Sequence, residues 1–444
     1  MAFIVFKTKY SEGLKQPAFV PTGILDIDSQ GVHSVANYEF VRVAIEFNNY
    51  KQVIVSGTAS HSTTWVLKKD GTLWGAGCNY YGSQGSGNYD DVKTFTRRLT
   101  NVKQIAASEY TTYAVKKDGT LWCCGRNDYG QQGSGNTTVV TTFTQRLTNV
   151  SKVVCGGIFT AWAIKNDGTL WGTGNNGIGS QGSGDTTNVT TFTQRLTNVI
   201  DVKATPDETW ALRADGSLWS CGSNSYGQQG IGNTTTVKTF TKKMENVKDF
   251  NLSNEHTWVI KNDGTLWGCG SNSHGQQGSG NTTNVTSFTQ RMTNVKQVFC
   301  DDRVSWVLKN DGTFWGCGSN SKGQQGNGEE GNNKYVTTFT QRLTNVADAS
   351  CSGETTWAIK TNKTLWGCGS ETYGQQGSGR YSDYYGVKNF TQRLSNVERV
   401  ACSKVNTWAV VGNESLYSCG NNEKGQQGTG STDTRINTFA KRNV

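Results

Sequence analysis

Short runs of apolar residues, separated by polar turns, fill the chain from residue 49 to residue 444. The segment TWVIKNDGTLWGCG at 257–270 holds two such runs on either side of an Asp-Gly pair. Asp-Gly tolerates the positive φ values of a tight hairpin, so the segment predicts two antiparallel strands. Both runs are apolar at nearly every position instead of alternating, which indicates a sheet covered on both faces.

This pattern recurs eight times at spacings of 48 to 51 residues, marked by Trp74, Trp122, Trp171, Trp219, Trp267, Trp315, Trp366 and Tyr417. A second aromatic residue always lies nine positions earlier. Segments such as VKQIAAS at 102–108 and TFTQRL at 142–147 add two strands to each repeat. We label the four predicted strands A to D in chain order.

Four strands in a repeat of this length are typical of a propeller blade, and no useful helical periodicity appears. The sequence therefore predicts an all-β protein, a β-propeller of eight four-stranded blades spanning residues 49–444. Seven blades with an atypical end are the alternative.

The repeated skeleton is W-x5-G-x2-W/Y-x2-G-x-N-x2-G-Q-x-G, represented by Trp258, Gly264, Trp267, Gly270, Asn272, Gly275, Gln276 and Gly278. On these residues the chain resembles the regulator-of-chromosome-condensation repeat family over about nine-tenths of its length. The resemblance implies a β-propeller, and it is specific for fold but not for function. The family's exchange factors use a projecting wedge and a basic tail, and we find neither in this sequence.

Residues 1–48 lie outside the repeats and are interpreted either as an ordered N-terminal wrap or as an attachment module for a particle or for self-association. Residues 41–52, which extend past the end of this segment, align with the sequence of a D-type strand followed by the start of an A strand. Residues 437–444 form a second D-type candidate. One of the two is expected to complete the last blade and close the ring.

Charge and targeting signals narrow the function. The net charge of +9 is scattered, which makes a nucleic-acid interface unlikely in the absence of a basic cluster. No stretch is long and apolar enough to span a membrane, and the N-terminus is a poor signal peptide. These features predict assembly in the cytoplasm and reduced cysteines.

The sequence motifs indicate neither a set of catalytic residues nor a cofactor-binding site. The glycine-rich loops lead to strands and not to the helix that a phosphate site needs. The cysteines occupy repeat positions without CxxC pairs, and the four histidines lie at unrelated positions. We therefore expect a non-enzymatic protein with no cofactor, no metal and no catalytic residues, in which the cysteines act as small buried apolar side chains.

Differences between repeats point to the A–B and C–D loops, which emerge on one face of an up-and-down blade. Two C–D loops, at 328–336 and 379–387, carry short insertions. Function is expected on variable loops held by a uniform scaffold. The predicted ligand-binding face comprises Tyr81, Tyr89, Tyr110, Tyr129, Phe159, Tyr226, His256, His274, Arg303, Lys322, Tyr335, Tyr373, Tyr381, Tyr384 and Tyr385.

The leading interpretation is a phage or phage-tail-like receptor-binding protein that recognises a cell-surface glycan or protein through this loop face. It rests on the repeat composition and the distinct N-terminal segment. Two alternatives stay open: a guanine-nucleotide exchange factor or chromatin-associated scaffold, and an intracellular protein-interaction scaffold.

Overall fold

The computed structural model describes residues 26–28, 31–34, 50–56, 61–301, 303–331, 333–382, 385–412 and 415–444. The chain forms two compact units, Met1–Asn49 and Tyr50–Val444. In the first unit, β1 (Asp26–Asp28) pairs antiparallel with β2 (Gly31–Ser34). Most of the predicted attachment module and the D-type candidate before Tyr50 lie outside the described residues.

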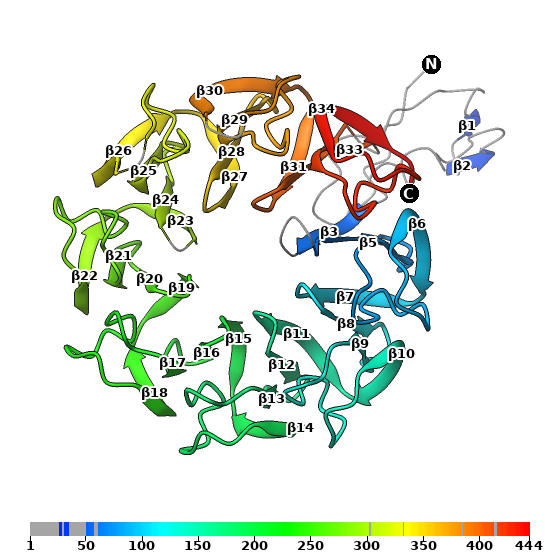
Figure 1. Cartoon of the computed structure of the whole chain (residues 1–444), viewed down its shortest axis with the longest axis horizontal. Helices are drawn as coiled ribbons and strands as arrows, with labels where there is room; N and C mark the ends of the chain where they lie inside the picture. Colours follow the sequence, from blue (N-terminus) through cyan, green and yellow to red (C-terminus); the bar gives the residue numbers. More distant parts are fainter. Residues whose placement is uncertain are drawn as a thin grey trace. The chain divides into compact units, whose positions relative to one another are not determined.

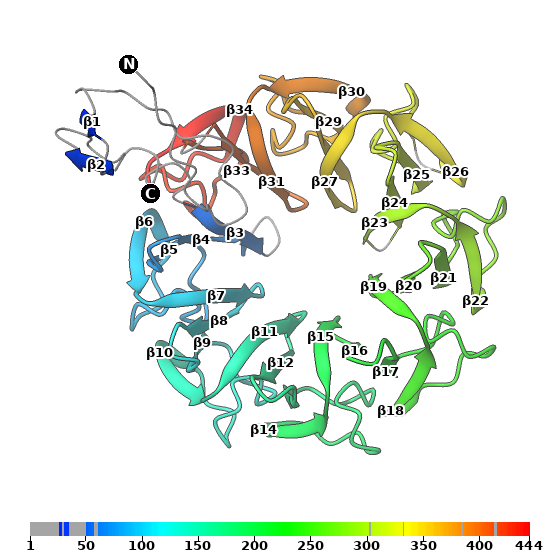
Figure 2. The same ribbon diagram turned by 180° about the vertical axis from the view of Figure 1, so that it is seen from behind.

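The second unit is a ring of eight four-stranded antiparallel sheets (Figure 1), seen from behind in Figure 2. Each blade is one continuous segment whose strands pair in the order A, B, C, D. No helix occurs among the residues that the structure describes. The all-β class and the eight blades are confirmed, and the seven-blade alternative is wrong.

The strand bounds repeat closely from blade to blade. Blades 1 to 4 comprise β3 (Tyr50–Ser56), β4 (Thr63–Lys68), β5 (Leu73–Gly77), β6 (Val92–Leu99); β7 (Val102–Ala107), β8 (Thr111–Lys116), β9 (Leu121–Gly125), β10 (Val140–Leu147); β11 (Val150–Gly156), β12 (Thr160–Lys165), β13 (Leu170–Gly174), β14 (Val189–Leu196); and β15 (Val199–Ala204), β16 (Glu208–Arg213), β17 (Leu218–Gly222), β18 (Val237–Met244). Blades 5 to 8 comprise β19 (Val247–Leu252), β20 (His256–Lys261), β21 (Leu266–Gly270), β22 (Val285–Met292); β23 (Val295–Asp301), β24 (Val304–Lys309), β25 (Phe314–Ser319), β26 (Tyr335–Leu343); β27 (Val346–Ser352), β28 (Thr355–Lys360), β29 (Leu365–Ser370), β30 (Gly386–Leu394); and β31 (Val397–Cys402), β32 (Asn406–Val411), β33 (Ser415–Asn421), β34 (Arg435–Arg442).

The hairpin between strands B and C is held by a short chain of polar contacts. In blade 5 the backbone N–H and the hydroxyl of Thr265 both donate to Asp263 Oδ1, at 2.9 and 2.6 Å. Trp267 Nε1 donates to Thr265 Oγ1, and Lys261 lies 4.8 Å from the centre of the Trp267 ring. These hydrogen bonds from Thr265 lower the pKa of Asp263. The Asp-Gly signal in the sequence is therefore explained by turn geometry.

Each joint between blades is built on a buried aromatic residue of strand B, which is tryptophan in seven blades and Tyr113 in blade 2. Trp258 is fully buried, and Phe339 of the next blade meets its ring edge-on at 5.6 Å between centroids. Gly278 lies beside Phe339 at φ +61, and a Cβ there would come within 2.5 Å of that ring. The same Trp–Phe contact recurs between Trp408 of blade 8 and Phe95 of blade 1. The repeated strand B aromatic residues and C–D loop glycines therefore form the contacts between neighbouring blades.

Ring closure repeats the aromatic contact and the isolated bridge found at other joints. β34 completes blade 8, as expected for residues 437–444, and blade 1 begins with β3 in the A position. The bridge between Thr94 and Thr429 repeats the bridge between Ser86 and Thr142 one joint further along. Among the described residues no sheet contains strands from two blades, so side-chain packing and isolated bridges close the ring.

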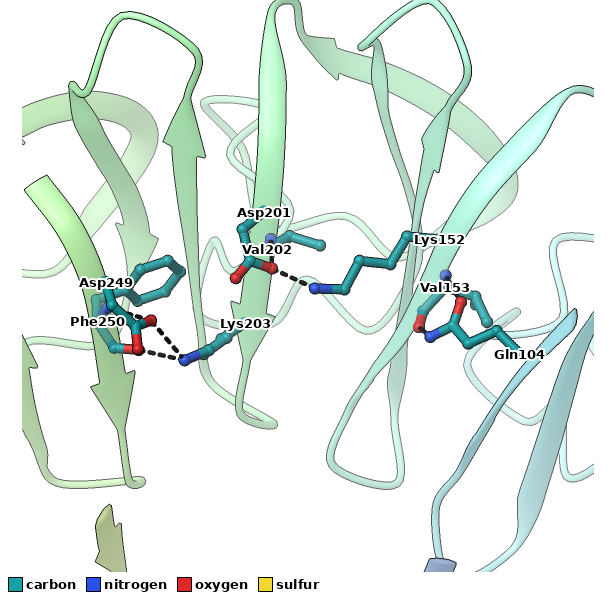
Figure 3. Close-up of polar contacts among 8 residues, drawn as sticks. All are labelled: Gln104, Lys152, Val153, Asp201, Val202, Lys203, Asp249 and Phe250. Carbon is teal, nitrogen blue, oxygen red and sulfur yellow. Dashed lines mark hydrogen bonds and ion pairs between the residues drawn. The ribbon is translucent and has the colours of Figure 1, made fainter. Parts of the chain in front are cut away.

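Side chains of the A strands also tie neighbouring blades together along the inner rim (Figure 3). Gln104 exchanges two hydrogen bonds of 2.9 Å with the backbone of Val153. Lys152 pairs with Asp201 one blade further on. These contacts add polar links to the apolar joints.

The cysteines are part of this scaffold. Within the described part of the chain none of the twelve cysteines forms a disulfide. The Cys269 thiol is buried and donates to Gln228 O of the preceding blade at 3.1 Å. Burial raises its pKa well above the usual range, which keeps the thiol protonated and unreactive.

Candidate binding face

Contacts across the blade joints place the A–B and C–D loops on one face. Tyr81, from the C–D loop of blade 1, lies 4.9 Å from Tyr110 of the blade 2 A–B loop, measured between ring centroids. Tyr129 and Phe159 repeat this contact one joint further on, at 4.8 Å. Each C–D loop therefore meets the A–B loop of the following blade, and side chains from neighbouring blades form shared surfaces.

The densest of these surfaces extends over blades 1 to 3. Its centre is Arg126, whose guanidinium carbon lies 5.1 to 5.9 Å from the centres of four aromatic rings. We call it the aromatic–arginine cluster: His61, Tyr80, Tyr81, Tyr110, Arg126, Tyr129 and Phe159. Cation–π contacts of this kind are attractive within about 6 Å of a ring centre, so the arginine orders the rings around it.

Acidic neighbours hold the cluster in place. Arg126 Nε donates to Asp128 Oδ2 at 2.7 Å. His61 Nδ1 lies 3.6 Å from Glu109 Oε1. Burial, followed by the charge of Glu109, raises the pKa of Tyr110 to about 12, so its hydroxyl stays neutral. The cluster thus offers ordered rings, a neutral hydroxyl and a paired guanidinium.

Part of the cluster is open to solvent. Tyr80 is 62% exposed and meets His61 and Tyr81 edge-on. Tyrosine and arginine combine flat apolar area with polar tips, which is typical of protein-binding hot spots. Among the described residues no group of three or more His, Cys, Asp or Glu side chains could hold a metal ion. The arrangement favours binding over chemistry.

A smaller surface extends over blades 6 to 8. The guanidinium of Arg435 lies 4.6 Å from the Tyr381 ring centre and 5.9 Å from that of Tyr373. The two insertions predicted from the sequence meet here: Glu330 accepts a hydrogen bond from Gly386 N at 2.8 Å. Tyr381 and Tyr385 are 56% and 66% exposed. Tyr384 lies outside the described residues.

The other predicted residues are spread around the ring. Tyr89 and Tyr226 are exposed in the C–D loops of blades 1 and 4, and Arg303 is exposed after β23. His274 meets Tyr335 edge-on at 5.0 Å, while Lys322 is half-buried. None of these joins the aromatic–arginine cluster, which combines four predicted residues: Tyr81, Tyr110, Tyr129 and Phe159.

The prediction for His256 is wrong. Its side chain is 0% exposed, with Nδ1 2.8 Å from Ser253 Oγ and Nε2 3.1 Å from Ser305 Oγ. Burial lowers its pKa to about 3, so it is neutral. The physical reason is its place: His256 is the first residue of β20 and faces the joint with blade 6, not the loop face.

Arg126, Tyr80 and His61 belong to the cluster but are not among the binding-face residues predicted from the sequence. The missed signal is a difference between repeats. At the position of Arg126 the other seven repeats carry Cys78, Asn175, Ser223, Ser271, Ser319, Ser370 and Asn421. A single long cation among small residues marks a position that the scaffold does not require.

Comparison with known proteins agrees with the repeat architecture. The model of the regulator of chromosome condensation (RCC1) repeat matches residues 102–131 and 247–276. None of the curated proteins searched matches the chain.

Three solved structures share the fold at low identity. Human WBSCR16 is 18% identical at a TM-score of 0.57, covering 75% of this chain and 96% of its own. Prp20p of Saccharomyces cerevisiae, described with its binding to Gsp1p and histones, is 16% identical at 0.58, covering 79% and 93%. Yeast RCC1 (Prp20) bound to Kap60 is 14% identical at 0.58, covering 89% and 94%. Such identities establish the fold alone.

No helix in the described part of the chain has the length and hydropathy needed to cross a membrane.

Proposed function

We propose that this chain, in which two segments match the regulator-of-chromosome-condensation repeat, is a non-catalytic propeller that binds protein partners through its A–B and C–D loop face. The observation that carries this proposal is the aromatic–arginine cluster. Arg126 draws together rings from three blades at a position where the other repeats hold small residues. Ordered tyrosines around an arginine supply the kind of anchor on which protein interfaces depend.

The comparisons support a protein partner more than a particle-bound receptor. The yeast protein Prp20 is described with protein partners: Gsp1p, histones and Kap60. The receptor-binding interpretation has no such support from the structures described above, so the interaction-scaffold alternative becomes the main proposal. Guanine-nucleotide exchange and chromatin association are narrower versions of that alternative.

The test compares two arginine-to-serine variants of the full chain. Arg126→Ser removes the centre of the cluster and installs the residue found in four other repeats. Arg213→Ser is the matched control, because Arg213 also lies against a ring, that of Trp219, but on the B–C turn face. Quantitative affinity capture from the source cells is expected to recover a set of proteins about tenfold less with Arg126→Ser, corresponding to roughly 1.4 kcal/mol.

Equal recovery by both variants and the wild-type protein would contradict the proposal. Recovery that falls equally with Arg126→Ser and Arg213→Ser would do so as well, because it would reflect general destabilisation. If no protein is captured and the chain binds glycan arrays in a manner that depends on Arg126, the result would favour a glycan ligand instead.

A further inference from the structure

The joint between blade 8 and blade 1 departs from the other seven at one paired position. Near the end of strand D, seven blades place Leu or Met opposite the first apolar residue of strand C: Leu73 with Leu99, Leu121 with Leu147, Leu170 with Leu196, Leu218 with Met244, Leu266 with Met292, Phe314 with Leu343, and Leu365 with Leu394. In blade 8, Leu416 is opposite Arg442. Arg442 matches the basic residue that precedes this Leu or Met in the other blades, such as Arg393 before Leu394, and Asn443 stands in the place of the Leu or Met. Arg442 Nε donates to Ser418 Oγ at 2.7 Å.

A cavity of about 230 Å³ lies at this joint. Its apolar wall includes Trp408, Val410 and Leu416, which are all buried, together with Val53 and Val400. An apolar cavity of about 150 Å³ accepts benzene, so this one has room for a bicyclic ring system or a branched aliphatic group. Blade 8 has no Leu or Met at the end of its strand D, and Val444 packs against the same apolar cluster as Leu416.

The edge of the cavity is cationic. Lys51 and Arg399 line it and are both exposed. Arg399 donates to Lys51 O at 2.9 Å, and Lys51 Nζ donates to Lys103 O at 2.6 Å. Within the described residues neither side chain is paired with an acid. Two unpaired cations beside an apolar cavity are complementary to a ligand with one apolar and one anionic end.

We propose that this cavity binds a small amphipathic carboxylate. Its aromatic or branched aliphatic group occupies the space between Trp408 and Leu416, and its carboxylate lies against Lys51 and Arg399. The guanidinium can offer paired N–H donors to a carboxylate while the lysine adds a point charge. This site is independent of the loop face and of the partners proposed above.

The test uses indole-3-acetate as the probe and its uncharged amide, indole-3-acetamide, as the matched ligand. Isothermal titration of the full chain is expected to show one site for the acetate, with the amide about tenfold weaker. The double variant Lys51→Gln/Arg399→Gln is expected to abolish that preference. Lys296→Gln, at the position of Lys51 in the blade 6 A strand, is the control and leaves it unchanged.

A filling variant tests the apolar half. Ala401→Phe places a ring in the cavity wall, and blade 6 already carries Phe299 at the same strand position, so the fold accommodates it. It is expected to eliminate binding of both ligands without lowering the melting temperature. Unchanged binding by Ala401→Phe, equal affinity for acetate and amide, or no binding of the acetate by the full chain would each overturn the proposal.

Discussion

The blade joints and the loop face of this propeller follow opposite rules. In the joints the same contact returns around the ring: Phe339 meets Trp258 at 5.6 Å, and Phe95 meets Trp408 at 5.8 Å. On the loop face equivalent positions differ, and Arg126 stands where other repeats hold Ser, Asn or Cys. The difference teaches that the joints fix the positions of the loops while leaving their side chains free to vary. Repetition here builds a scaffold, and departure from it marks a candidate site.

The largest effect is expected when one of the aromatic side chains between two blades is removed. Trp258→Ala is expected to lower the free energy of unfolding by about 3–5 kcal/mol, because it leaves a large cavity beside Phe339. Urea denaturation measures the loss. Trp267→Ala, which removes a half-exposed ring of the same repeat, is expected to cost clearly less. Equal losses would contradict the assignment of the joint to the strand B tryptophan.

A second prediction concerns a joint position that is not uniform. Strand B begins with Thr in four blades but with His256 in blade 5. Burial lowers the pKa of His256 to about 3, below its unfolded value near 6.5. Its contribution is therefore intact above pH 6.5 and is lost as the pH falls toward 3. The cost is about 2 kcal/mol between pH 7 and pH 5.

His256→Thr is expected to flatten this acid dependence in chemical denaturation followed from pH 7 to pH 5. Glu208→Gln in blade 4 gives the opposite control. Burial raises the pKa of Glu208, so the wild-type carboxyl reduces stability as the pH rises above its unfolded value. An acid dependence that is the same with and without His256 would contradict its burial in the joint.

The smallest expected effect lies in the B–C turn. Thr265→Val removes the donor to Asp263 and the acceptor of Trp267 Nε1, and it is expected to cost about 1 kcal/mol of unfolding free energy. The exposed Thr282→Val in the C–D loop of the same blade is the control, with little change expected. A larger loss than for Trp258→Ala would reverse the ranking of turn and joint.

The fold could be predicted because each blade repeats both its apolar runs and its glycines. The strand B aromatic residues and the glycines of the C–D loops recur with the period of the repeat, and these residues make the contacts between neighbouring blades. The spacing of the repeat in the sequence therefore predicts the packing of the blades. The loop face was predicted in part: Tyr81, Tyr110, Tyr129 and Phe159 come together, because strand pairing forces C–D and A–B loops to meet.

The failures have local causes. A residue beside a strand boundary is exposed if it belongs to the loop and buried if it is the first residue of the strand. His256 pairs with Gly270 as the first residue of its strand, and its side chain is therefore buried. Arg126 was overlooked because the loop comparison followed the aromatic position three residues later. Asn443 in place of the strand D Leu or Met is visible in the sequence, but the cavity of the closing joint depends on how β3 packs against Trp408, Val410 and Leu416.

Every blade is a single continuous segment whose four strands pair only with one another. Duplicating or deleting one repeat would therefore add or remove a whole sheet and leave every remaining hydrogen-bonded ladder intact. Only the angle between neighbouring blades would have to adjust, and that angle is spread over all the joints. Gain or loss of one repeat during evolution would therefore change the ring by one complete blade.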